Sequence, residues 1–184
     1  MIERSLQKVY FFIEQHRFAE ADKELRQLMA SQPGEPYVLY LAAVCKLQLK
    51  EFDKAEEFVK SAIGIDPANP DFLCLYARIL FVLRKSKEAE GAINQAIQLN
   101  PYNASYFSIL SDIYFERKEW EKALHFANEG LAIDPEDVSC LNNRAAALMK
   151  LDRKESAYDT IKEALNQDPE NEYTHTNLGW GLLE

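Results

Sequence analysis

The chain has 184 residues, 47% hydrophobic and 28% charged, with a formal net charge of −9. This hydrophobic content is enough for a core, so the composition does not indicate a disordered chain. The negative charge argues against binding to the phosphates of nucleic acids or to anionic lipid surfaces. The longest apolar runs, such as Val38–Cys45, are too short to cross a bilayer, so this segment is not expected to insert into a membrane.

The residues that usually carry catalysis or metal binding do not form a known pattern. The three cysteines are 29 and 66 residues apart, which fits neither a metal site nor a CxxC redox pair. The three histidines have no second ligand at helical spacing, and HExxH, GxGxxG and GK[ST] motifs are absent. We therefore expect no catalytic residue, no metal and no cofactor. The sequence does not open with the basic and then apolar stretch of a signal peptide, so we expect a cytoplasmic protein.

Two residue types recur with one period along almost the whole chain. Prolines fall every 34 residues, and alanines keep the same spacing. The prolines are Pro33, Pro67, Pro101, Pro135 and Pro169, and the alanines are Ala21, Ala55, Ala89, Ala123 and Ala157. A fixed period of this length indicates a single supersecondary unit stacked on itself.

The period divides the chain into one array of similar units. With each proline at position 32, the units are 2–35, 36–69, 70–103, 104–137 and 138–171, followed by a partial repeat or capping helix at 172–184. Apolar residues recur three and four apart in each unit, which predicts two helices rather than strands. In chain order, the predicted helices are 2–15, 18–31, 36–49, 52–65, 70–83, 86–99, 104–117, 120–133, 138–151, 154–167 and 172–183.

Residues at the ends of the predicted helices agree with these boundaries. Position 34 holds a residue whose side chain can cap the next helix, and these residues are Asn69, Asn103, Asp137 and Asn171. Positions 8 and 20 hold mostly small residues, such as Ala43 and Ala55 in the second unit. Small side chains at regular positions predict points where two helices cross closely.

The pattern resembles the tetratricopeptide repeat family over essentially the whole chain. The family signature, W-x2-L-G-x2-Y followed by A-x3-F and P, is matched in the fourth unit. The matching residues there are Phe107, Leu110, Ser111, Tyr114, Ala123 and Pro135. Lys8, Lys46 and Arg144 depart from it, because they occupy places that are usually apolar or aromatic. The resemblance implies an all-α solenoid, a right-handed superhelix of about five and a half helix-turn-helix repeats whose first helices line a concave groove.

Family geometry places positions 2, 5, 9 and 12 of each first helix in that groove. At these positions the chain changes from aromatic and apolar residues in the first units to small and polar residues in the later ones. The candidate contact residues for a protein or peptide partner are Tyr10, Tyr37, Tyr40, Arg78, Asp112, Asn142 and Asn143. Co-chaperones of the family grip a C-terminal carboxylate with two cations in the groove. No register of this chain supplies both cations, so that function is not expected.

The C-terminal end leaves two functional interpretations open. The first is a non-catalytic protein-interaction scaffold, and the second is a regulatory or substrate-selecting array of a larger enzyme or membrane-anchored protein. The apolar residues of the last helix favour a chain that continues beyond it over a natural cap. The same apolar residues, Leu178, Leu182 and Leu183, predict a homodimer through the C-terminal helix.

Overall fold

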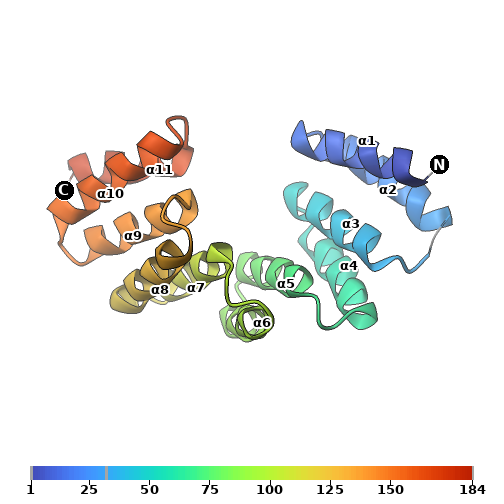
Figure 1. Ribbon diagram of the computed structural model, residues 1–184, viewed down its shortest axis with the longest axis horizontal. Coiled ribbons are helices and arrows are strands. Elements are labelled where there is room, and N and C mark those ends of the chain that lie inside the picture. Colours follow the sequence, from blue (N-terminus) through green and yellow to red (C-terminus); the bar gives the residue numbers. More distant parts are fainter. Residues whose placement is uncertain (1, 32, 184) are drawn as a thin grey trace. The chain divides into compact units, whose positions relative to one another are not determined.

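The computed structural model describes the backbone of residues 2–31 and 33–183, with side chains for 4–31 and 33–179. Over these residues the chain is all helical, with eleven helices and no strand (Figure 1). The helices are α1 (Ile2–Glu14), α2 (Phe18–Ser31), α3 (Pro36–Gln48), α4 (Phe52–Ile65), α5 (Pro70–Val82), α6 (Ser86–Leu99), α7 (Ala104–Glu116), α8 (Trp120–Ile133), α9 (Val138–Lys150), α10 (Lys154–Gln167) and α11 (Glu172–Leu183). Each helix begins at the predicted residue and ends within one residue of the predicted end, so the predicted solenoid of helix pairs is confirmed.

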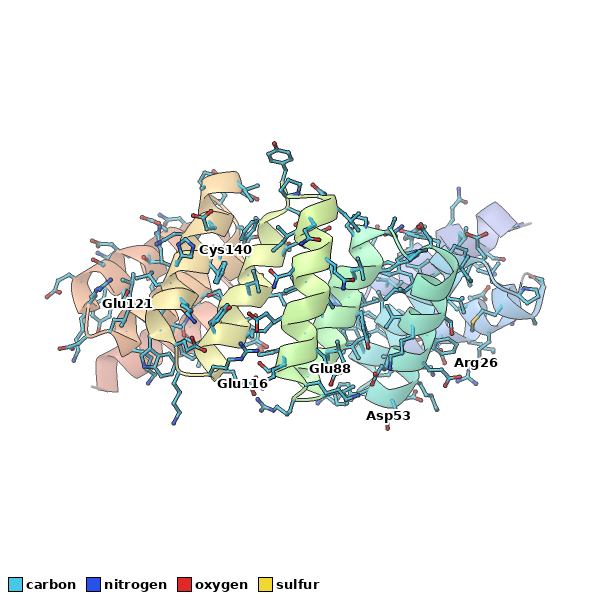
Figure 2. The ribbon with its side chains drawn as sticks, turned by 90° about the horizontal axis from the view of Figure 1, so that it is seen from below. Arg26, Asp53, Glu88, Glu116, Glu121 and Cys140 are labelled. Atoms are coloured by element: carbon cyan, nitrogen blue, oxygen red, sulfur yellow. The ribbon has the colours of Figure 1, made fainter. Side chains whose placement is uncertain are left out.

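The chain falls into two compact units, Met1–Leu99 and Asn100–Glu184. In each unit the two helices of a repeat pack on one another, as α3 does on α4 and α7 on α8. The second helix of a repeat also packs on the first helix of the next repeat, as α2 does on α3 and α8 on α9. The second helices turn charged residues such as Asp53, Glu88 and Glu121 toward solvent (Figure 2).

The turn between the two helices of each repeat contains one residue in the left-handed backbone region. These residues are 34 apart and none is glycine: His16, Lys50, Arg84, Lys118 and Asp152, with φ between 55° and 62°. In the second repeat the N–H of Lys50 donates to Leu47 O (3.0 Å) and that of Glu51 to Lys46 O (2.9 Å). These bonds satisfy carbonyl groups at the end of α3 and offset the strain of the left-handed residue.

The predicted capping residues accept hydrogen bonds from the start of the next helix. Asn69 Oδ1 accepts from Asp71 N (3.1 Å), and Asn103 Oδ1 accepts from Ser105 N (3.0 Å). In the later repeats Asp137 accepts from Cys140 N (2.7 Å) and Asn171 from Thr174 N (3.1 Å). The four side chains therefore satisfy backbone donors that have no partner inside their helices, and the capping prediction is confirmed.

The alanines at position 20 lie at the crossing of the two helices in each repeat. All five are fully buried, as predicted. Position 8 of the first helix is also buried, and Ser111 at this position donates its hydroxyl to Ala123 O (2.8 Å). That short contact shows how closely the side chain at position 8 approaches the backbone of the second helix. Larger side chains at either position would push the helices apart.

We expect Ala89→Leu to lower the free energy of unfolding by about 1–3 kcal/mol, because the added atoms overpack the closed crossing of α5 and α6. Ala132→Leu is the matched control, since Ala132 is exposed on α8. Urea unfolding followed by circular dichroism measures both variants. Equal stability of Ala89→Leu and the parent would contradict the close crossing.

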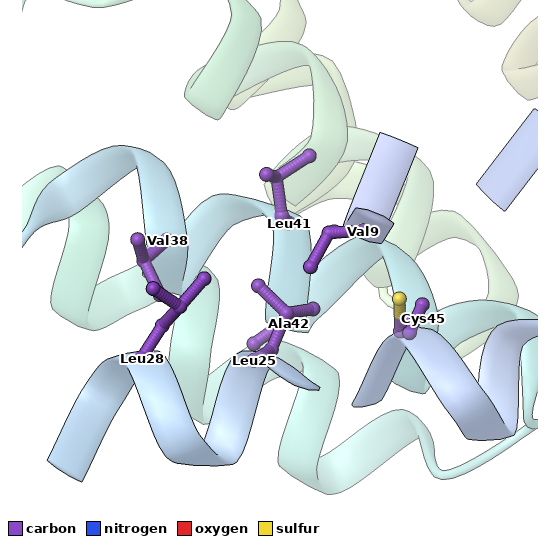
Figure 3. Packing of buried hydrophobic residues seen from close by; sticks show 8 residues of the cluster. Val9, Leu25, Leu28, Val38, Leu41, Ala42 and Cys45 are labelled. Atoms are coloured by element: carbon purple, nitrogen blue, oxygen red, sulfur yellow. The ribbon is translucent and has the colours of Figure 1, made fainter. Parts of the chain in front are cut away.

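A hydrophobic cluster joins the first two repeats of the first unit. Its buried side chains come from α1, α2 and α3 and contact one another across the three helices (Figure 3). They are Val9, Ala21, Leu25, Leu28, Val38, Leu41, Ala42 and Cys45. Because neither repeat could bury these residues alone, the cluster makes the fold of the first repeat depend on the second.

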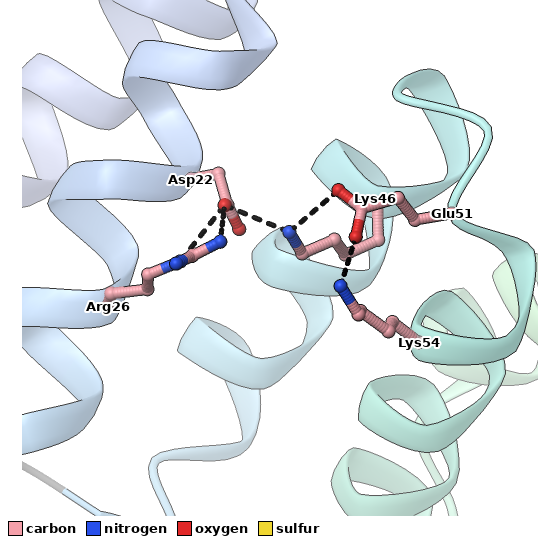
Figure 4. Close-up of polar contacts among 5 residues, drawn as sticks. All are labelled: Asp22, Arg26, Lys46, Glu51 and Lys54. Carbon is pink, nitrogen blue, oxygen red and sulfur yellow. Dashed lines mark hydrogen bonds and ion pairs between the residues drawn. The ribbon is translucent and has the colours of Figure 1, made fainter.

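Beside this cluster lies a buried ion pair between the same two repeats (Figure 4). Lys46, only 3% exposed, donates its ammonium to Asp22 Oδ2 (2.9 Å) and to Glu51 Oε1 (3.0 Å). Asp22 also accepts from Arg26 (2.8 Å), and Glu51 pairs with Lys54. Burial alone would lower the pKa of Lys46, but its hydrogen bonds to the two carboxylates raise the pKa above its ordinary value. Lys46 therefore remains charged at neutral pH, and on the alkaline side its contribution to the pair is lost only above the ordinary lysine range.

We expect Lys46→Met to lower the free energy of unfolding by about 1–3 kcal/mol, because Asp22 is then left buried with Arg26 as its remaining partner. The double variant Asp22→Leu/Lys46→Met should recover most of that loss, since two apolar side chains of similar volume replace the pair. Lys54→Met is the control, because Lys54 contacts Glu51 from a 60% exposed position. Chemical denaturation measures the parent, the single variants Asp22→Leu and Lys46→Met, the double variant and the control. Additive effects of the two single changes would refute the coupling.

Candidate functional site

The first helices of the first unit carry a ladder of aromatic rings. Tyr37 and Tyr40 of α3 stack with ring centroids 5.5 Å apart, and Tyr40 stacks on Phe72 of α5 at 5.3 Å. Phe72 is buried, whereas Tyr37 and Tyr10 of α1 are each 40% exposed. Tyr10, Tyr37 and Tyr40 are called the tyrosine face below. The stacking on a buried ring fixes the orientation of Tyr37 and Tyr40 while leaving part of the face open to solvent.

Two hydroxyl groups of the tyrosine face, those of Tyr10 and Tyr40, have raised pKa values. Partial burial and a hydrogen bond to Tyr37 raise the pKa of Tyr10 to about 12. Burial, together with the negative charge of Asp71, raises the pKa of Tyr40 to about 12. The hydroxyl groups of Tyr10 and Tyr40 are therefore neutral hydrogen-bond donors and acceptors at physiological pH.

Next to the tyrosine face, one side of α5 presents two opposite charges. Asp71 lies in the first turn of the helix and Arg78 two turns later, and both are exposed. Between them, Cys74 is half-buried, and its burial raises the pKa of the thiol to about 11 even though Arg78 opposes the shift. The charge of Arg78 also opposes the raised pKa of Tyr40, although burial and the charge of Asp71 outweigh it. Tyr10, Tyr37, Tyr40 and Arg78, four of the candidate residues, thus lie within one unit.

The other three candidate residues lie in the second unit, where their surroundings differ. Asn142 of α9 is only 7% exposed, and its amide group donates to Asn171 Oδ1 (3.2 Å). The amide of Asn177 donates to the backbone carbonyl of Asn142 (3.2 Å). Asn143 donates to the carbonyl of Ser108 on α7 (2.9 Å). These amides tie α7, α9 and α11 together, so much of their hydrogen-bonding capacity is already used within the chain.

Asp112 lies half-buried on α7, near enough to Cys140 for its charge to contribute to the raised pKa of that thiol, after the larger effect of burial. At the C-terminal end, Leu178 is half-buried, and the side chains of Leu182, Leu183 and Trp180 lie outside the described residues. The predicted homodimer through the last helix therefore stays a prediction.

The rest of the described structure gives little indication of a catalytic or metal site elsewhere. A shallow hollow of about 290 Å³ in the first unit is lined by Pro67, Ala68, Leu73, Gln95, Gln98 and Leu99. None of these side chains is charged, and the hollow contains no group suited to acid, base or nucleophilic chemistry. Across the described residues, no three His, Cys, Asp or Glu side chains lie close enough to hold a metal ion. Within the same residues, no helix is both long and apolar enough to cross a membrane.

Stacked helix pairs with aromatic residues on their first helices define a helical-repeat protein of the solenoid class. Two family models described as tetratricopeptide repeat match residues 75–138 and 138–171. A third, described as anaphase-promoting complex, cyclosome, subunit 3, matches residues 14–96. The chain is therefore a tetratricopeptide repeat protein, as the sequence pattern predicted. A search of curated proteins finds no significant match.

Solved structures show the same fold at low sequence identity. A thermophilic TPR protein of Thermus thermophilus is 18% identical and has a TM-score of 0.88, with all of both chains covered. PilF of Pseudomonas aeruginosa is 19% identical with a TM-score of 0.81, over 94% of this chain and 79% of that one. YrrB, described as a TPR protein with an unusual peptide-binding site, is 13% identical with a TM-score of 0.64, over 94% and 89% of the two chains.

Proposed function

We propose that this chain is a non-catalytic interaction scaffold that binds a peptide or protein segment on the first helices of its repeats. The observation that carries the proposal is the tyrosine face. Tyr10 and Tyr37 each remain 40% exposed, and Tyr37 is held in place by stacking. Large aromatic side chains exposed in this way are costly to leave in water and typical of protein interfaces.

The rigidity of the tyrosine face supports binding further. Tyr37 and Tyr40 are already ordered by stacking before any partner arrives, so little side-chain entropy remains to be lost on association. Each hydroxyl can bond to a peptide backbone while the ring covers an apolar side chain. YrrB, a TPR protein of similar fold with an unusual peptide-binding site, supports this proposal.

We propose that Tyr10, Tyr37, Tyr40 and Arg78 make the main contacts. Asp112, Asn142 and Asn143 are proposed as secondary contacts in the second unit. The amide nitrogens of the two asparagines already donate to groups of the chain, so their contribution to a partner comes from what remains exposed. We expect substitutions in the tyrosine face to weaken binding more than substitutions in the second unit.

The test is to capture partners on the tagged chain, purify the strongest one, and measure its dissociation constant by calorimetry. Tyr37→Ser should weaken binding at least about tenfold, because it removes a half-exposed ring from the centre of the proposed interface. Tyr102→Ser is the matched control, since Tyr102 is an 83% exposed tyrosine in a loop of the second unit. Both variants should keep the thermal unfolding midpoint of the parent.

The opposite pattern of effects would reject this location. If Asp53→Ala and Glu88→Ala, on the second helices, weaken binding while Tyr37→Ser and Arg78→Gln do not, the partner binds the outer face. If none of the four variants changes the affinity, the first helices are not the binding site.

A further inference from the structure

We infer that the tyrosine face and Arg78 together select an extended peptide segment with two apolar side chains followed, about three residues later, by a side-chain carboxylate. This inference rests on the proposed function and names the kind of segment that the same site recognises.

The apolar part of the segment follows from the exposed rings. Tyr10 and Tyr37 each leave 40% of their surface in water, and the neighbouring groove positions on α1 and α3 hold Leu6, Ile13, Val44 and Leu47. All six residues are aromatic or aliphatic. A partner therefore gains most by covering this region with apolar side chains, at roughly 25 cal/mol for each Å² removed from water.

The polar groups of the tyrosine face favour a partner that accepts hydrogen bonds. In the hydrogen-bonded pair of Tyr10 and Tyr37, one hydroxyl hydrogen lies in the bond and the other is left to donate elsewhere. An extended peptide supplies backbone carbonyl groups along its length, whereas a helix uses its own carbonyl groups internally. The donors therefore favour an extended segment over a helical one.

The charges on α5 determine where an acidic group would lie. Among the groove positions of α1, α3 and α5 whose side chains the structure describes, Arg78 is the only cation. Asp71 lies seven residues earlier on the same helix, or about 10 Å away at 1.5 Å per residue. A carboxylate is therefore attracted toward the Arg78 end of α5 and repelled from its other end, while a lysine at the Arg78 end would meet a like charge.

The spacing in the segment follows from the spacing of the helices. Packed helices lie about 8–10 Å apart, so Arg78 on α5 is about one such step from the rings on α3. An extended chain advances about 3.3 Å per residue, so about three residues cover that distance. The carboxylate thus lies about three residues beyond the apolar side chain that covers Tyr37.

The experiment uses fluorescein-labelled peptides of eight residues and the full chain, with binding followed by fluorescence anisotropy. The probe has Phe second, Leu fourth and Asp seventh, with Gly and Ser elsewhere and an amidated C-terminus that leaves the side chain as its only carboxylate. Matched probes carry Lys in place of Asp, or Ser in place of both apolar residues. We expect each change to weaken binding at least about fivefold.

The protein variants separate the two parts of the site. Arg78→Glu should reverse the preference, so that the Lys probe binds more tightly than the Asp probe, whereas the control Lys87→Glu, at an exposed cation on α6, should not. Tyr37→Ser should weaken the Asp and Lys probes equally. The chain should remain folded in each case, as its circular dichroism spectrum would show.

Two results would overturn the inference. One is equal binding of the Asp and Lys probes with no effect of Arg78→Glu. The other is an Asp probe that binds no better than its Ser version at the highest protein concentration. If a captured partner still loses affinity with Tyr37→Ser, the proposed interaction face stands and only the nature of the segment is wrong. If that partner is also unaffected, both proposals fail.

Discussion

The close crossing of the two helices within each repeat is the constraint on which the rest of the structure depends. The position-20 alanines are fully buried, and so are the side chains at position 8 of the five complete repeats. Helices that approach closely hold the large residues on either side of the crossing in fixed grooves. Ser111 shows how little room the crossing leaves for a side chain at position 8, because its hydroxyl reaches the second helix and donates to the backbone carbonyl of Ala123. The aromatic ladder of the first unit is ordered because the helices that carry it are held in this way.

The cations Lys46 and Arg144, which replace residues that are usually apolar, each have a carboxylate partner on a neighbouring helix. Lys46 occupies a place that is usually apolar and is held by Asp22 of the preceding repeat. Arg144 occupies another, and its guanidinium donates to Thr160 (3.0 Å) and pairs with Glu163 on α10. Burying Lys46 alone would cost several kcal/mol, which its pairing with Asp22 offsets, whereas Arg144 is only half-buried. The Lys46–Asp22 pair joins two repeats, whereas the Arg144–Glu163 pair lies within the fifth repeat.

The two units use the same first-helix positions differently. In the first unit these positions present half-exposed rings and two charges, which suit contact with a partner. In the second unit Asn142 and Asn143 donate to neighbouring first helices and strengthen the stack. Position in the repeat therefore does not by itself assign a residue to binding. Whether a side chain faces a partner or a neighbouring repeat depends on the residues around it.

The sequence by itself determined the fold, because a 34-residue period of proline and alanine, with capping residues in phase, fixes every helix to within one residue. It also placed the tyrosines on one set of helices. The tertiary structure decided which polar side chains form hydrogen bonds within the chain, since partners such as Asn143 and Ser108 lie 35 residues apart on different helices. It likewise paired Gly130 with Cys140: a methyl group on the glycine would clash with the cysteine sulfur, so the absent side chain makes room for the thiol. Periodicity specifies the backbone, but contacts between particular side chains depend on the packing of neighbouring helices, which no local pattern encodes.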